Sequence, residues 1–259
     1  MNQPMKPNQT NKQIKKKRAQ FIMIMIVLVL FIFGVVKIVN SQKKSALDHT
    51  EPKQIQTTTS KIKTTESSAN LPYELTTPAF SQKAGKRIQE RTKNKDLKLI
   101  IQTDERWGTK FYGTDEKKDT IAQNGCAIAV LAMIDSYWQK KNTSIDDILK
   151  WSGNQYFHQD QGTDWIIFPM FAEEFGYQVE QTLDFDKIEK SISDGIPIVV
   201  SVSPGTFTDN GHFLILFADS NGKWMVLDPN DSPKKKHYEQ NFDRELFQKE
   251  ALNFWIFTK

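Results

Sequence analysis

The apolar residues between positions 126 and 138 recur with the period of an α-helix. One helical face, at positions i, i+3, i+4 and i+7, is made by Val130, Met133, Ile134 and Tyr137. The preceding residues, AQNG, are typical of a loop. The pattern therefore predicts a helix that begins at Cys126 and buries one face in a core.

Three later segments also carry helical signals. They are residues 144–153, 163–177 and 184–195, and each contains a glycine at or next to its C-terminal end, where glycine commonly ends a helix. Ser144 and Asp147 have the spacing of a capping box, with Asp in place of the usual Glu. We predict a helix in each of these segments.

After residue 195 the pattern changes from helical to extended. Short runs rich in β-branched and aromatic residues occupy positions 196–202, 211–219, 223–229 and 253–259, with turn residues between them. Asn-Gly at 221–222 favours a hairpin turn, because such turns need positive φ values. Helices followed by antiparallel strands predict an α+β fold, in which N-terminal helices pack on a C-terminal antiparallel sheet. A short strand or extended segment near residue 97 is expected to open this domain, residues 97–259.

The N-terminal region has a different pattern. Residues 1–20 contain several lysines and one arginine and no acid, and residues 21–39 are almost uniformly apolar. A stretch of this length can span a bilayer, with its single lysine reaching towards the interface. We predict a basic cytoplasmic tail (1–20) and a single-pass transmembrane signal anchor (21–39) in the cell membrane, which places the later residues outside the membrane. The alternative is a cleaved signal peptide, for which the one weak cleavage candidate lies near Ser45 and Ala46.

Residues 40–96 are polar and rich in serine and threonine, and their few apolar residues show no sustained period. This composition predicts a disordered stalk. Residues 81–95 fit either a short basic helix or a solvated linker, and the linker is the favoured interpretation. Contact between this basic stretch and an anionic wall polymer or lipid headgroups is the minor alternative.

The composition excludes several classes of protein. A single cysteine, Cys126, rules out an internal disulfide, and no cluster of cysteine and histidine suggests a metal site, so neither a metal nor an organic cofactor is expected. The basic residues of the tail outnumber the net charge of the whole chain, +4, so the remainder is net acidic. Nucleic-acid binding therefore finds little support.

Cys126 is a candidate nucleophile because it stands at the start of the predicted helix. The partial positive charge of a helix N-terminus stabilises a thiolate, and the N–H groups there can face a developing oxyanion. The alternative is a buried cysteine that acts as a small apolar residue.

His212 is the candidate base. It is the histidine that lies inside a predicted apolar strand, whereas His49 falls in the stalk, His158 in a polar loop and His237 in a basic run. Asp228, at the end of the next strand, is the candidate partner, because the hairpin brings positions near 212 and 228 about opposite one another. The alternative for Asp228 is an ordinary Asp-Pro turn.

Three segments together resemble the papain-like cysteine peptidases of the bacteriocin-leader-processing family, in its C-39-like branch. They are TIAQNGCAIAVLAMI, DFDKIEKSISDGIPIVVSV and GHFLILFADSNGKWMVLDPN. The resemblance covers residues 99–259 and implies a papain-like fold with Cys126 as nucleophile, His212 as general base and acid, and Asp228 as the orienting group. It also implies an oxyanion-hole glutamine, for which Gln102 is favoured over Gln123. Thr120 stands where transporter-linked members place that glutamine, and the sequence Cys126-Ala127 replaces their common Cys-Gly.

These observations predict a membrane-anchored extracytoplasmic cysteine peptidase without a transporter module, which hydrolyses a peptide or amide bond through a thioester acyl-enzyme. The expected partner is a peptide or protein substrate. One alternative is a catalytically idle binding or scaffold module at the cell surface, with a peptide groove lined by Trp107, Trp151 and Trp165. Another is a thiol hydrolase that acts on peptidoglycan peptides, reached through the stalk.

Overall fold

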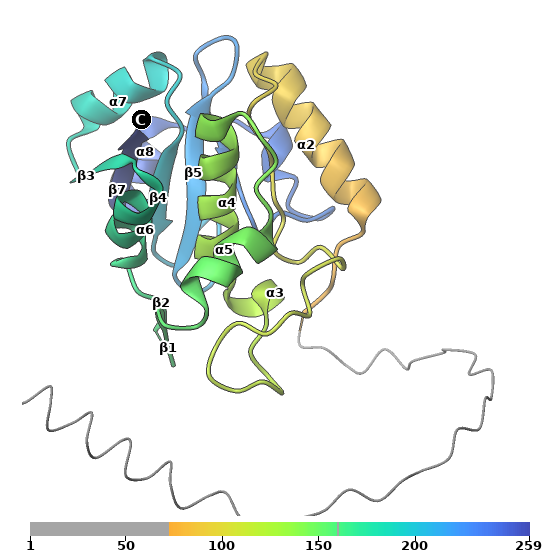
Figure 1. Ribbon diagram of the computed structural model, residues 1–259. Coiled ribbons are helices and arrows are strands. Elements are labelled where there is room, and N and C mark those ends of the chain that lie inside the picture. The colour runs from red at the N-terminus through yellow and green to blue at the C-terminus, as the bar shows by residue number, and fades with distance from the viewer. Residues whose placement is uncertain (1–72, 160) are drawn as a thin grey trace, which may run out of the picture. The chain divides into compact units, whose positions relative to one another are not determined.

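The computed structural model describes residues 73–259 apart from residue 160, and its main feature is a five-stranded antiparallel sheet with helices on both faces (Figure 1). The helices are α2 (Pro78–Thr92), α3 (Ile121–Asn124), α4 (Cys126–Gln139), α5 (Ile145–Ser152), α6 (Ile167–Phe175), α7 (Phe185–Ser193), η2 (His237–Glu239) and α8 (Arg244–Glu250). The strands are β1 (Phe157–His158), β2 (Gly162–Thr163), β3 (Gln178–Thr182), β4 (Ile198–Val202), β5 (His212–Ala218), β6 (Trp224–Leu227) and β7 (Ala251–Thr258).

The predicted tail, the anchor and the first part of the stalk lie outside the described residues. Within residues 73–259, no helix has both the length and the apolar character needed to cross a bilayer.

The main sheet has the strand order β3-β7-β4-β5-β6, and every neighbouring pair is antiparallel. The predicted antiparallel sheet is therefore present. The small strands β1 and β2 form a separate hairpin. Since β7 inserts between β3 and β4, the last strand in sequence order lies inside the sheet and not at its edge.

The central strands β4 and β5 are buried on both faces, and their successive side chains point alternately into two cores. Val199 and Ile215 belong to a core that also contains α4, α5 and α6, whereas Val200 and Leu214 belong to a core with α7 and α8. Continuous runs of apolar residues such as IVV and LIL in the central strands follow from burial on both faces.

α4 is the central helix of the first core. The predicted apolar face is present, but every residue from Ala127 to Ser136 is buried, so the helix is enclosed and not merely half-buried. A helix surrounded in this way is rigid, and its first residue has a fixed position.

The structure corrects the boundary of the predicted stalk. Residues 78–92 form α2, whose Ala84 and Ile88 are fully buried in the core. Thr77 caps the helix, and Arg91 donates hydrogen bonds of 2.9 Å to the carbonyl oxygens of Tyr238 and Gln240. The linker interpretation of residues 81–95 is therefore wrong. The sequence pattern did not predict this helix, because the buried side of α2 consists of a few small or isolated apolar residues and the rest of the helix is basic.

Other elements also differ from the predictions. β3 and α8 were not predicted, and residues 97–101 are extended without forming a strand of the sheet. The capping box of α5 is present, with the side chain of Ser144 accepting from the backbone of Asp147. The hairpin turn after β5 is also present, with Gly222 at φ 78°.

Candidate active site

A tight turn fixes Cys126 as the first residue of α4. The amide of Gly125 donates to the carbonyl of Ile121 at 2.8 Å, and the carbonyl of Gly125 accepts from Ala129 at 2.9 Å. A Cβ at position 125 would lie 2.6 Å from the carbonyl oxygen of Ile121, which is too close for any residue other than glycine. The sequence Gly-Cys therefore joins α3 to α4 with the thiol at the helix start.

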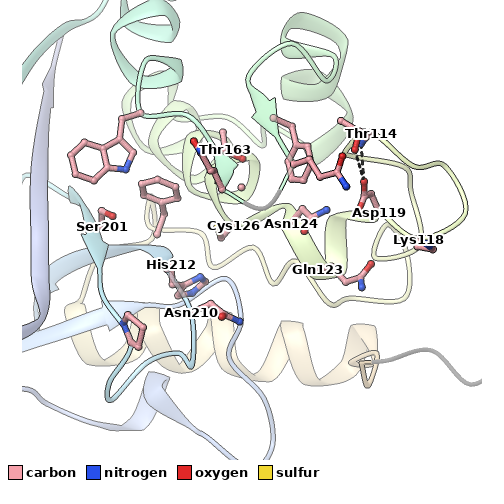
Figure 2. A pocket seen from close by; sticks show the side chains of 18 of the residues that line it. Thr114, Lys118, Asp119, Gln123, Asn124, Cys126, Thr163, Ser201, Asn210 and His212 are labelled. Atoms are coloured by element: carbon pink, nitrogen blue, oxygen red, sulfur yellow. Dashed lines mark hydrogen bonds between the residues drawn. The ribbon is translucent and has the colours of Figure 1, made fainter.

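His212 is the first residue of β5, where it pairs with Val202 of β4. Its side chain is almost completely buried, and Nε2 lies 2.7 Å from Oδ1 of Asp228. Cys126 and His212 line the same pocket, and Figure 2 shows their side chains next to each other. The structure therefore brings together the three residues that the sequence analysis selected.

The hairpin register differs slightly from the expected one. Ile215 pairs with Leu227, so the continued register places Leu214, and not His212, opposite Asp228. His212 reaches Asp228 as a diagonal neighbour on the same face, a separation that a long side chain can bridge. The contact depends on the length of the imidazole ring.

His212 and Asp228 stabilise each other's charged forms. Burial disfavours the imidazolium, but the charge of Asp228, its hydrogen bond and the interaction with Cys126 outweigh burial and raise the pKa of His212 from 6.5 to about 9. Burial also disfavours the carboxylate, but the charge of His212 and the hydrogen bonds from His212 and His237 lower the pKa of Asp228 well below its ordinary value. Asp228 is therefore an anion, and both imidazoles donate to it. This leaves Nδ1 of His212 for the thiol.

The pocket that contains Cys126 and His212 has a volume of about 760 Å³ and is lined by both polar and apolar residues. Polar residues of the segment 114–124 line one part, including Lys118, Asp119 and Gln123. The apolar residues that line the pocket are Phe157, Trp165, Pro204, Phe213 and Leu252. A pocket of this size lies within the usual range of ligand-binding sites.

The three tryptophans that were predicted to line a groove have different roles. Trp165 is 38% exposed and lines the pocket, packed edge-on against Trp255. Trp151 packs on core aromatics such as Phe171, and Trp107 donates its Nε1 to the carbonyl of Ile101 at 2.7 Å. Only Trp165 fits the prediction.

The two oxyanion-hole candidates occupy different places. Gln102 is buried, and its Nε2 donates to the carbonyl of Ala122 at 2.8 Å while its backbone N–H donates to Pro229. It thus links the segment before Cys126 to the segment after Asp228. Gln123 is exposed and lines the pocket. The oxyanion role of either glutamine stays a prediction.

His237 is a residue that the sequence analysis placed in a basic surface run. It is buried, and its Nδ1 lies 2.7 Å from Oδ2 of Asp228. The lysines before it gave a surface-like pattern, while the short turn η2 carries too few residues to show a period. Among the described residues, no group of three or more histidine, cysteine, aspartate or glutamate side chains is arranged to hold a metal ion.

The antiparallel sheet, the enclosed helix and the pocket with a cysteine and a histidine agree with the class of cysteine peptidase domains. The model of the Peptidase_C39 like family matches residues 95–257, more than half of the chain, and the chain belongs to that family. No curated protein sequence matches this chain.

Three solved structures are similar to the chain. The peptidase domain of Streptococcus ComA, a bi-functional ABC transporter involved in quorum sensing, is 22% identical with a TM-score of 0.39, over 56% of this chain and 93% of that one. The Streptococcus mutans ComA peptidase domain with a small-molecule inhibitor is 17% identical with a TM-score of 0.36, over 58% and 99% of the two chains. A putative C39-like peptidase from Bacillus anthracis is 15% identical with a TM-score of 0.38, over 52% and 89%.

Proposed function

We propose that this protein is a membrane-anchored, extracytoplasmic cysteine peptidase that hydrolyses a peptide or amide bond. The observation that supports this most is the pocket in which Cys126 meets His212, with Asp228 bound to the far nitrogen of the imidazole. An open pocket gives a substrate carbonyl access to the thiol. Membership of the family supports the same reaction class.

Acylation begins from the ion pair of a Cys126 thiolate and a His212 imidazolium. The sulfur attacks the carbonyl carbon, and the carbonyl oxygen becomes an oxyanion, which we propose is stabilised by N–H groups at the start of α4. The C–N bond then breaks, and the leaving amine takes the proton of His212. The product of this step is a thioester on Cys126 and a free amine.

Deacylation reverses the role of His212. A water molecule gives its proton to the neutral imidazole and attacks the thioester carbonyl, and the C–S bond breaks. A carboxylic acid leaves, and the thiolate and imidazolium are restored. Asp228 keeps the ring oriented in both halves of the cycle and stabilises its charged form.

The location is part of the proposal. Residues 1–39 combine a basic tail with an apolar stretch long enough to span a bilayer, which supports a single-pass anchor with the domain outside the membrane. An accessible substrate there is a secreted protein, a peptide or a wall peptide.

The first test is alkylation of the full-length protein in detergent with iodoacetamide. Cys126 is the sole cysteine, so every label reports on this site. We expect labelling at pH 7 to be about tenfold or more faster in the wild type than in His212→Ala, because the imidazolium holds the thiol ionised. Equal rates in the two proteins would refute the activated thiolate.

A second experiment identifies the substrate class. The full-length protein is incubated with purified wall peptides and, separately, with an unfolded protein, and new amino termini are detected by mass spectrometry. Cys126→Ala serves as the inactive control. Cleavage of unfolded protein supports a general peptidase, and cleavage of wall peptides alone supports the wall hydrolase. If neither is cleaved although Cys126 is activated, general peptide hydrolysis is overturned in favour of a binding module.

A further inference from the structure

The carboxylate of Asp228 has a hydrogen-bond donor on each of its two oxygens. Oδ1 accepts from Nε2 of His212 and from the backbone N–H of Asn230, both at 2.7 Å. Oδ2 accepts from Nδ1 of His237 at 2.7 Å. Asp228 is 1% exposed, so no bulk water is available to replace a lost donor. The second histidine is thus a partner that the proposed reaction does not itself use.

The ring of His237 is enclosed by aromatic side chains. It packs edge-on against Phe207 and Phe242, with ring centroids 5.4 and 5.9 Å away. These apolar walls offer no hydrogen-bond donor to the nearby Oδ2 of Asp228. The N–H of His237 is therefore the donor that satisfies this oxygen among the described residues.

The backbone that carries His237 is also fixed. A buried carboxylate, that of Asp231, accepts from the N–H of His237 at 3.0 Å and from the N–H of Tyr238 at 2.8 Å. From the other side, the guanidinium of Arg91 on α2 binds the carbonyl oxygen of Tyr238. The turn η2 is therefore held through both its N–H and its carbonyl groups, and its histidine cannot easily turn away from Asp228.

We propose that His237 is a positioning residue, which holds the Asp228 carboxylate in the orientation and charge state that sustain the Cys126–His212 ion pair. The inference rests on the proposed function, because it concerns the reactivity of the same thiol. His237 acts through Asp228 and does not line the pocket that contains Cys126.

The physical consequence follows from the burial of Oδ2. A buried carboxylate oxygen without a donor is unfavourable, so the carboxylate rotates towards another donor or takes up a proton. Either change weakens its interaction with His212. The imidazolium then loses stabilisation, and the fraction of Cys126 present as thiolate falls.

Two substitutions separate hydrogen bonding from packing. His237→Asn places an amide nitrogen near the position of Nδ1 and keeps a donor, but it removes the ring. His237→Phe keeps an aromatic ring between Phe207 and Phe242 but has no donor. Positioning requires the donor, whereas a purely structural role requires the ring, so the two roles predict opposite orders of activity for the two variants.

The test is the rate at which iodoacetamide alkylates Cys126 in the full-length protein at pH 7. We expect His237→Phe to slow alkylation about tenfold, because a hydrogen bond to a charged group is lost, and His237→Asn to stay within about threefold of the wild type. Circular dichroism and thermal unfolding show whether each variant is folded. If His237→Phe fails to fold, His237→Leu repeats the loss of the donor in a smaller side chain.

The results separate the two proposals. A wild-type rate no faster than that of His212→Ala overturns the proposed function itself. A fast wild type with an equally fast His237→Phe overturns the role of His237 alone. A fast His237→Phe combined with a slow His237→Asn shows that the ring matters for packing and not for the hydrogen bond, which also overturns the inference.

Discussion

Replacing Asp228 by asparagine tests the electrostatic basis of the site. The asparagine side chain keeps an oxygen that can accept from His212, but it removes the negative charge. The pKa of His212 lies at about 9 against an ordinary 6.5, although burial alone acts in the opposite direction. A difference of this size corresponds to about 3 kcal/mol of preferential stabilisation of the imidazolium, and the contribution of Asp228 and Cys126 must exceed it because they also overcome burial.

The sign of the effect determines the pH range. Because the pKa of His212 is raised, its imidazolium is fully formed below 6.5 and is lost as the pH rises through about 9. Without the charge of Asp228, the main interaction that opposes burial is lost and the pKa of His212 falls. The wild type and Asp228→Asn therefore differ most between pH 6.5 and about 9, where the wild type keeps His212 protonated.

The assay is the alkylation rate of Cys126 with iodoacetamide between pH 5 and pH 10 (~0.5 pH steps). At pH 7.5 we expect Asp228→Asn to react about a hundredfold more slowly and to recover only at high pH, where the thiol ionises by itself. Asp115→Asn removes a carboxylate from the same pocket without touching His212 and is the control. Superimposable profiles for the wild type and a folded Asp228→Asn would refute the electrostatic argument.

Two further predictions concern the scaffold. Ile88→Ala should lower the free energy of unfolding by about 3 kcal/mol, because a fully buried side chain of α2 is removed. The exposed control Lys86→Ala should change it by less than about 0.5 kcal/mol. Denaturant unfolding followed by tryptophan fluorescence measures both, and equal stabilities of the two variants would mean that α2 is not part of the core. Gly125→Ala should slow alkylation of Cys126 roughly ten- to hundredfold, because the new Cβ displaces the backbone that holds the thiol. Gly211→Ala, also beside the pocket but with open space around its Cβ, should retain the wild-type rate, and an unaffected Gly125→Ala would show that the turn tolerates a side chain.

The elements with strong local signals were predictable from the sequence. α4 and α5 have an apolar period and a glycine or capping residue at the start, and β4 and β5 are runs of β-branched and aromatic residues. Their types follow from local propensity and spacing. The family resemblance added the topology, which local patterns do not contain.

The features that escaped prediction depend on contacts between distant parts of the chain. β3 is a strand with mostly exposed residues that is recruited by pairing with β7, and α2 is stabilised by a few buried side chains and by the bonds of Arg91. His237 has no distinguishing neighbour in the sequence, because its partner Asp228 and its aromatic walls come together only in the folded domain. The three site residues could be predicted from the sequence, because the hairpin and the helix start already limit where the side chains of Cys126, His212 and Asp228 lie.

The position of β7 has a consequence for the order in which the domain forms. β3 joins the sheet through β7, and β4 also pairs with β7, so the sheet is divided in two until residues 251–258 are available. These residues are synthesised after all the other strands. The sheet therefore cannot close while the earlier strands are being made, and its many pairings between distant segments favour slow folding.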